Sequence, residues 1–438
     1  MKMIRFIVEK GKSILAWSYI MAMFFVIPLY HRGTYDSISQ RKVEAFYFIG
    51  IVALALYFII SIAVDFRNNY ESDKKEMTGL STTDVAMIVF GASSVLAFAF
   101  SSYRKEALYG VPGFGMGLLT VVLMILSYFL ISRNLILNDM IFHFITLSSI
   151  PSVFIAIVNR LGYDPLHLYP EGSDTKTHLY VSTFGNYSVF SEYLTFIIPV
   201  VLCMLILSKR NAIRIFYAVY LVILLWAIRL AGTGMLYLSI ASVIVFLILN
   251  KFCSKNGRIT DLLIRTMLIL LPVVYCIFIL FGSGKDSFAN DRGYIWKLSV
   301  DLYKNLSPFK KIVGVGPNCY MYAFDDYLVL HPALIDEVNE RFRYLALTSA
   351  HSDYFDYLIN TGLFGLISYF TMIGMVIRRF YKREHRSLAT IISMACMVSY
   401  LTYTMINFSI ICATPYLYIF MGIVSSESNK EVCKKKTE

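Results

Sequence analysis

The stretch AFYFIGIVALALYFIISIAV, residues 45–64, contains no charged side chain. A helix needs about 20 mostly apolar residues to cross the hydrocarbon core of a bilayer. Where no water is present, a helix also satisfies its own backbone hydrogen bonds. Residues 45–64 therefore predict a transmembrane helix.

Other stretches of the chain share this length and composition. Together with residues 45–64 they predict twelve spans, at 13–30, 45–64, 83–101, 113–132, 139–158, 186–207, 212–230, 231–252, 262–282, 354–377, 387–404 and 405–424. The chain of 438 residues is 57% hydrophobic and 16% charged, with a mean hydropathy of +0.62, whereas soluble domains carry about 25% charged residues. We therefore predict an all-α integral membrane protein in which residues 1–438 form one polytopic domain.

The distribution of basic residues predicts the orientation of these spans. With the N-terminus in the cytoplasm, the cytoplasmic segments carry 24 Lys and Arg residues, and the external segments carry 8 when the long segment 283–353 is set aside. Short cytoplasmic loops of membrane proteins are enriched in Lys and Arg. We therefore predict a multi-pass protein of the cell membrane, with both termini cytoplasmic and with 283–353 as an external loop between spans nine and ten.

Composition also argues against several classes of function. The net charge of +11 is spread over short loops, and no basic stripe with interleaved aromatic residues predicts nucleic-acid binding. The seven Cys and seven His residues are dispersed, which predicts neither a metal site nor a disulfide framework. We expect the lipid bilayer as a partner and no cofactor.

Two positions near the external loop can support chemistry. Arg292 and Trp296, in DRGYIW at 291–296, are spaced to share one face of a helical turn. Arginine suits phosphate binding because its planar fork donates two parallel hydrogen bonds, although an arginine here can also contact lipid headgroups. His351 lies at the predicted outer interface, where an imidazole can take a proton from a sugar hydroxyl. A capping or interfacial role is its alternative.

A third position is the start of the sixth predicted span. Asn186 and Ser188 are residue types that favour a helix start. Glu192 lies about two turns into that span, and Arg229 lies near the outer end of the next one. Because ionisable residues within a span are costly and mark functional sites, we predict a Glu192–Arg229 pair. A purely structural ion pair is the alternative to a functional one.

Several segments, taken together, resemble the O-antigen ligase and polysaccharide polymerase superfamily of bacterial envelopes. They are EALYGVPGFGMGLLTVV (106–122), RLGYDPLHLYP (160–170), TFGNYSVFSEYLTFIIP (183–199), DRGYIWKLSVDLYKNLSPFKKIVGVGPNCY (291–320) and HSDYFDYLINTGLFGLISYF (351–370). The last two are similar to the family's Arg-x-x-x-Trp segment with its G-x-G element and to its His-Asn signature followed by G-x-x-G. The resemblance covers most of the chain between about residues 100 and 375.

The resemblance implies glycosyl transfer at the outer membrane face, without a metal or a nucleotide sugar. The implied donor is a glycan on undecaprenyl diphosphate, and the implied acceptor is a hydroxyl of another glycan or of a lipid-linked sugar. Arg292 would hold the diphosphate and His351 would assist the acceptor, which makes them the candidate catalytic residues. We assign Arg229, Glu192, Trp296 and Asn186 to substrate binding.

The sequence departs from the family pattern at two places. Gly232-Thr233-Gly234 stands where the family commonly has Ser-Arg-Gly at the start of span eight, and Arg229 lies one turn earlier as a replacement. Ser352 follows His351 where the family usually has Asn. The alternative function is a flippase for lipid-linked glycans or another multi-span transporter, although transporters commonly contain two equivalent halves and this sequence contains no internal repeat. A non-catalytic membrane scaffold is a third possibility.

Overall fold

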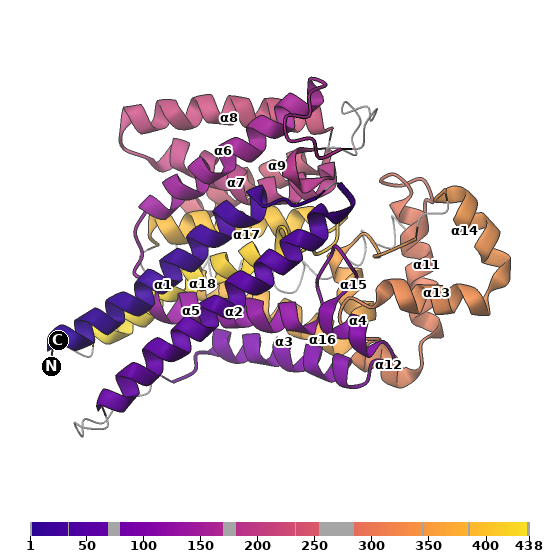
Figure 1. Ribbon diagram of the computed structural model, residues 1–438, viewed down its shortest axis with the longest axis horizontal. Coiled ribbons are helices and arrows are strands. Elements are labelled where there is room, and N and C mark those ends of the chain that lie inside the picture. The colour runs from indigo at the N-terminus through magenta and orange to yellow at the C-terminus, as the bar shows by residue number, and fades with distance from the viewer. Residues whose placement is uncertain are drawn as a thin grey trace.

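The structure is a computed structural model that describes residues 2–33, 35–68, 79–169, 181–232, 234–253, 284–343, 346–383 and 386–435. Every regular element in these ranges is a helix, as the sequence predicts. Most of the helices lie side by side in one bundle, and a smaller group extends from one end of it (Figure 1). The two termini lie together at the opposite end of the bundle (Figure 1).

The bundle contains the long helices of the chain. They are α1 (Lys2–Leu29), α2 (Tyr35–Asn68), α3 (Thr82–Ala99), α5 (Leu118–Asn134), α6 (Met140–Arg160), α7 (Tyr187–Leu207), α8 (Asn211–Ala231), α9 (Gly234–Cys253), α16 (Gly362–Tyr381), α17 (Leu388–Tyr403) and α18 (Thr414–Lys435). The short helices α4 (Arg104–Tyr109) and η1 (Ser182–Phe184) lie in connections between them.

Within the described residues, eight helices are long and apolar enough to cross a membrane. They are α1, α2, α3, α6, α7, α8, α9 and α16. Helices α5 and α17 are apolar but shorter, and the predicted span 262–282 lies outside the described residues. The fold is therefore that of a multi-span membrane protein, while the number of twelve spans stays a prediction.

Two predicted spans have the wrong boundaries. The stretch 354–377 is divided into α15 (Asp353–Asn360) and α16. At the junction Gly362 has a φ of 68°, and a Cβ there would lie 2.2 Å from the carbonyl oxygen of Ile312, so the helix breaks where another segment crosses closely. The stretch 405–424 is helical only from Thr414, because Pro415 is favoured in the first turn of a helix and not in its interior. We call the connection before α18 the 404–413 segment.

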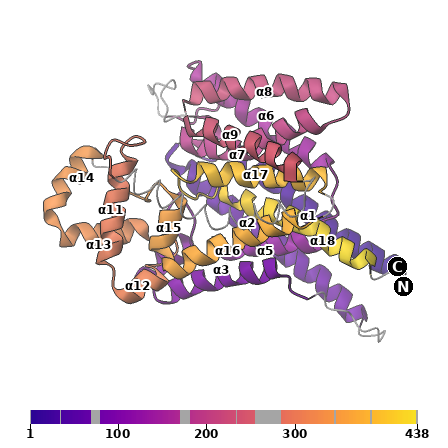
Figure 2. The ribbon, with the colours of Figure 1, turned by 180° about the vertical axis from the view of Figure 1, so that it is seen from behind.

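Helix α7 lies at the centre of the bundle, and most of its side chains are buried. Helices α8, α9 and α17 pack against it, while α5 packs against α18 and α3 packs against α16. Aromatic rings stack in this core, since Phe196 of α7 contacts Tyr400 of α17 and Phe420 of α18 with ring centroids 5.0 and 5.5 Å apart. Figure 2 shows α6 and α8 along one side of the bundle and α3 along the other.

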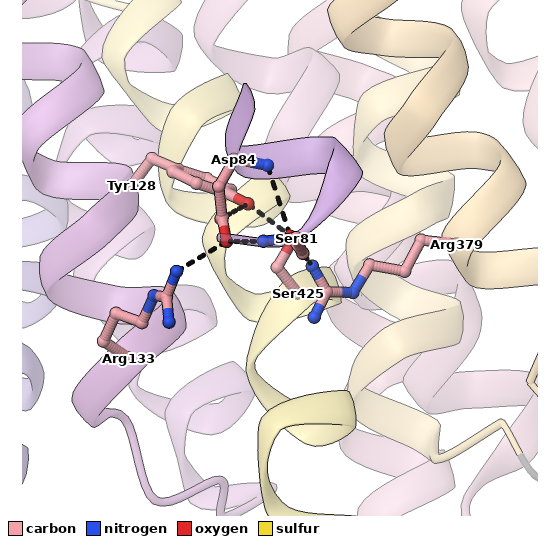
Figure 3. A network of polar contacts seen from close by, with 6 residues as sticks. All are labelled: Ser81, Asp84, Tyr128, Arg133, Arg379 and Ser425. Carbon is pink, nitrogen blue, oxygen red and sulfur yellow. Dashed lines mark hydrogen bonds and ion pairs between the residues drawn. The ribbon is translucent and has the colours of Figure 1, made fainter. Parts of the chain in front are cut away.

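A polar network joins α3, α5, α16 and α18 (Figure 3). It lies where α3 begins, toward the end of the bundle that carries the termini (Figure 1). Asp84, in the first turn of α3, accepts a hydrogen bond from the hydroxyl of Tyr128 (2.9 Å) and pairs with Arg133 (2.6 Å), both on α5. Ser81 forms a capping box with Asp84 and accepts a hydrogen bond from Arg379 of α16 at 3.0 Å. The hydroxyl of Tyr128 also lies 3.2 Å from a serine hydroxyl of α18. The network fixes this end of the bundle with a buried carboxylate whose oxygens are all partnered.

The described part of the predicted external loop is folded. It contains α11 (Arg292–Asn305), α12 (Pro308–Val313), α13 (Tyr320–Leu330), η2 (Pro332–Leu334) and α14 (Ile335–Arg341). These helices share a hydrophobic core of their own, which includes Trp296, Tyr320 and Phe324. They extend from the end of the bundle at which α15 and α16 begin (Figure 1). We call them the loop domain.

Close backbone contacts join the loop domain to α15. The N–H groups of Val315 and Gly316 donate to the carbonyl oxygens of Ile359 and Asn360 at 3.0 and 2.9 Å. Gly314 has a φ of 90°, and a Cβ there would lie 2.3 Å from the carbonyl oxygen of Asn360. The glycines of GVGPN therefore allow two segments of backbone to cross, and the crossing sets the position of α15 against the loop domain.

Candidate functional site

Arg292 is the first residue of α11, at the base of the loop domain. The three residues before it have φ values of 49°, 60° and 64°, so the chain enters α11 through a left-handed turn. The guanidinium donates hydrogen bonds to the carbonyl oxygens of Ala289 (2.8 Å) and Ile406 (2.7 Å) and to Oδ1 of Asn407 (3.3 Å). Because the last two residues belong to the 404–413 segment, Arg292 joins that segment to the loop domain.

Arg292 is a half-buried cation whose hydrogen-bond donors are only partly used by the surrounding residues. Burial lowers the pKa of Arg292, and the nearby phenols of Tyr187 and Tyr403 oppose this effect; an arginine nevertheless stays protonated in proteins. A guanidinium has five N–H donors, and described residues accept from Nε once and from each terminal nitrogen once. One N–H on each terminal nitrogen therefore has no acceptor among the described residues.

His351 lies in the segment between the loop domain and α15. Its φ of 50° is in the left-handed region, which costs a non-glycine residue about 1 kcal/mol or more. Its ring packs edge-on against Phe408, with centroids 5.2 Å apart, and Nδ1 is buried with no hydrogen-bond partner among the described residues. Burial and, to a smaller extent, the charge of Arg292 lower the pKa of His351 to about 3. Arg292 contacts Ile406 and His351 contacts Phe408, so both residues lie against the 404–413 segment although they are far apart in the sequence.

Trp296 lies one turn further along α11 and is fully buried. Its indole nitrogen donates a hydrogen bond to the carbonyl oxygen of Ala350 at 3.1 Å, in the residue before His351. Its ring lies beside Phe288 and Phe355, with centroids 5.7 and 6.5 Å away. The side chain that the sequence assigns to substrate binding therefore packs inside the loop domain, and it positions the segment that carries His351.

Residues 191–370 of the chain match the family model described as O-Antigen ligase. This part of the chain is similar to O-antigen ligases. The resemblance predicted from the sequence is thus confirmed, and it supports ligase-like or polymerase-like glycan transfer as the class of activity. Both candidate catalytic residues lie within the matched residues. No curated protein matches the chain.

The structure lacks the predicted pair between Glu192 and Arg229. Glu192 is buried inside the bundle with an exposed fraction of 2%, whereas Arg229 is exposed on α8. Among the described residues, no ion pair joins them. The two residues do lie toward the same end of neighbouring helices, but equal depth does not determine which face of each helix a side chain occupies. Their roles in substrate binding stay predictions.

Asn186 caps the N-terminus of α7, as its position in the sequence predicts. Its Oδ1 accepts a hydrogen bond from the N–H of Ser188 at 2.7 Å. The hydroxyl of Tyr403 donates to the carbonyl oxygen of Ser188 at 3.0 Å, which ties the start of α7 to the end of α17. The phenol of Tyr403 also raises the pKa of Arg292. The capped start of α7 therefore lies near Arg292. A direct contact of Asn186 with substrate stays a prediction.

Three polar residues of the matched region were not predicted from the sequence, namely Asp353, Asp356 and Asn360. All three are buried on α15 and line a cleft beside His351. The N–H of Asp353 donates to the carbonyl oxygens of Thr404 and Asn407 at 3.0 and 2.8 Å, so the segment that binds Arg292 also binds the start of α15. Spacings of three and four residues place the three side chains on one helix face, and this regularity is the signal that points to them.

Proposed function

We propose that this protein transfers a glycan from a polyprenyl diphosphate, such as undecaprenyl diphosphate, to an acceptor hydroxyl at the outer membrane face. The observation that carries the proposal is the joint placement of Arg292 and His351 within the region that matches the O-antigen ligase family model. In the reaction, the acceptor oxygen bonds to the anomeric carbon of the donor sugar. The bond from that carbon to the diphosphate oxygen breaks, and the diphosphate leaves with its electron pair.

Arg292 stabilises the charge that develops on the leaving diphosphate. A fixed cation in a site shielded from water stabilises such charge without reorganising during the reaction. The hydrogen bonds to Ala289, Ile406 and Asn407 hold the guanidinium in place. The N–H groups left on its two terminal nitrogens then contact two phosphate oxygens. A lysine at this position would keep the charge but lose the paired geometry.

His351 orients the acceptor hydroxyl. With its pKa lowered to about 3, the imidazole is neutral at physiological pH, so its unpartnered nitrogen accepts a hydrogen bond. The strained backbone at His351 supports a functional role, because such conformations persist only where the surrounding structure enforces them. A ligase and a polymerase share this chemistry and differ in the acceptor that they receive.

The outward orientation of the site follows from the predicted topology. The termini lie at one end of the bundle and the loop domain at the other (Figure 1). Cytoplasmic termini, which the excess of Lys and Arg predicts, place Arg292 and His351 at the outer face, where the glycans of a cell envelope are assembled.

The test is conversion of lipid-linked glycan to transferred product in membranes that contain each variant at matched expression. Arg292→Lys should lower the transfer rate about 10²-fold, as expected for the loss of one preorganised donor pair, and His351→Ala should also lower it. The matched control is Arg343→Lys, because Arg343 is exposed and lies just after α14. The transfer rate of this variant should stay at the wild-type value. Wild-type rates in both site variants would refute the assigned site.

A further inference from the structure

A polar cleft opens beside the Arg292–His351 site, where α15 meets the bundle. Its polar lining consists mainly of Ser94, Ser349, Asp353, Asp356, Asn360 and Ser409. Phe408 also lines the cleft, and its ring packs against His351, so the cleft and His351 share a wall. The cavity volume of about 40 Å³ accommodates a few groups of the size of water. It therefore admits the hydroxyl groups at one edge of a sugar.

Asp353 is held rigidly at this cleft with one oxygen unsatisfied. Its N–H is bonded to the 404–413 segment, and the hydroxyl of Ser409 donates to its Oδ1. The side chain is 1% exposed, and its Oδ2 has no hydrogen-bond partner among the described residues. A buried carboxylate oxygen without a partner is unfavourable. A ligand that brings a hydrogen-bond donor into the cleft removes that cost.

Asn360, which lines the same cleft, carries a second unsatisfied acceptor. Its side chain is 7% exposed, and its Oδ1 has no hydrogen-bond partner in the described part of the chain. Asp356 lies between the two on α15, and its Oδ1 accepts a hydrogen bond from the N–H of Ala350 at 2.8 Å. Two unsatisfied acceptors on one helix face fit a neutral ligand with several donors, and sugar hydroxyl groups have this character.

We propose that this cleft is the acceptor subsite and that Oδ2 of Asp353 takes the proton from the reacting hydroxyl of the acceptor sugar. This inference rests on the proposed function. As the acceptor oxygen bonds to the anomeric carbon and the diphosphate departs with its electron pair, the hydroxyl proton moves to Asp353, which later releases it to water. Asn360 binds a neighbouring hydroxyl and fixes the orientation of the sugar.

The electrostatic environment suits Asp353 better than His351 for this proton transfer. Burial raises the pKa of Asp353 to about 7, although hydrogen bonds from Ser409 oppose the increase. The pKa of His351 is lowered to about 3 by burial and by Arg292. A general base is most effective when its pKa lies near the working pH. His351 therefore orients the acceptor, and Asp353 receives the proton.

The titratable groups that interact with Asp353 come from the helices packed around it. They are Glu192 of α7, Tyr354, Asp356 and Tyr357 of α15, Tyr369 of α16, Tyr400 of α17 and Tyr418 of α18. None of these described groups is a cation, so no ion pair among them keeps Asp353 permanently ionised. Its protonation can therefore change during turnover.

The first test compares Asp353→Asn with Asp336→Asn in the full-length protein in membranes. Asp336 is exposed on α14, so its replacement should leave transfer unchanged. Asp353→Asn should lower the transfer rate by about 10²-fold or more, the usual contribution of a general base, while a polyprenyl-diphosphate photoprobe still labels it. Wild-type transfer by Asp353→Asn, with Arg292→Lys impaired, would overturn this inference and leave the proposed function standing. A wild-type protein that transfers no glycan would overturn both.

A second variant tests the inference even where Asp353→Asn does not fold. Ser409→Ala keeps the carboxylate of Asp353 but removes a hydrogen bond that lowers its pKa. The rising limb of the pH–rate profile should therefore move to higher pH, by about one unit for the loss of a hydrogen bond to a charged group. A limb at the wild-type pH in an active Ser409→Ala protein would contradict the assignment of Asp353 as the proton acceptor.

Discussion

Replacing Asp84 by Asn tests the polar network that joins α3, α5, α16 and α18 (Figure 3). The amide oxygen still accepts from Tyr128, but the NH₂ group cannot accept from Arg133 or from the N–H of Ser81. Losing a hydrogen bond between charged groups costs about 1.5–3 kcal/mol, and losing part of a helix cap costs about 0.5–1 kcal/mol. We expect the free energy of unfolding to fall by roughly 2–4 kcal/mol.

The assay is unfolding in mixed micelles with increasing SDS, followed by circular dichroism. The matched control is Asp139→Asn, because Asp139 is the N-cap of α6, is exposed and makes no capping hydrogen bond with its side chain. Its free energy of unfolding should change by no more than about 0.5 kcal/mol. If the two variants unfold at the same SDS fraction, the network does not contribute the stability that its geometry indicates.

Three further predictions concern the loop domain, His351 and the topology. Gly314→Ala should destabilise the protein and abolish transfer, because a Cβ there would lie 2.3 Å from a carbonyl oxygen of α15; Gly79→Ala, which meets nothing within 4 Å, should be neutral in both assays. The lowered pKa of His351 means that its imidazole takes up a proton on unfolding below pH 6.5, so its contribution to stability is present above that pH and is lost on acidification. Between pH 8 and pH 5.5 the free energy of unfolding should fall by about 1.4 kcal/mol through this residue. The free energy of unfolding of His351→Gln should fall by less over the same pH range. An impermeant thiol reagent should label a Cys at Ser287 and not at Ser428 in intact cells that carry an otherwise Cys-free protein, and the reverse would show that the topology is inverted.

Hydropathy alone predicts most of the helices. The observed bounds of α7 and α8 agree within a residue or two with the predicted spans 186–207 and 212–230, because long apolar stretches determine where a chain can cross a bilayer. The 404–413 segment is an exception, since it is apolar in sequence but is not helical. Its carbonyl groups accept hydrogen bonds from Arg292 and from the N–H of Asp353, and hydropathy does not encode such long-range contacts.

The candidate site is predicted in part. The charge pattern and the family resemblance together predict that Arg292 and His351 lie at one face of the membrane. In the structure the charge of Arg292 lowers the pKa of His351. The pairing of Glu192 with Arg229 is wrong, because one side chain faces the interior and the other is exposed. Asp353 is not predicted because residues 351–370 open a predicted membrane span, and the hydropathy of that stretch does not indicate how its carboxylates are placed.

The proposed function requires that the protein transfers glycan rather than moving it across the membrane. The most direct measurement uses purified protein in vesicles with a lipid-linked glycan donor and an acceptor, and it counts glycosidic bonds formed and polyprenyl diphosphate released. Transfer predicts equal amounts of the two for the wild type and a decrease in both for Arg292→Lys. Movement of the intact lipid-linked glycan between leaflets, without release of polyprenyl diphosphate, would contradict the claim.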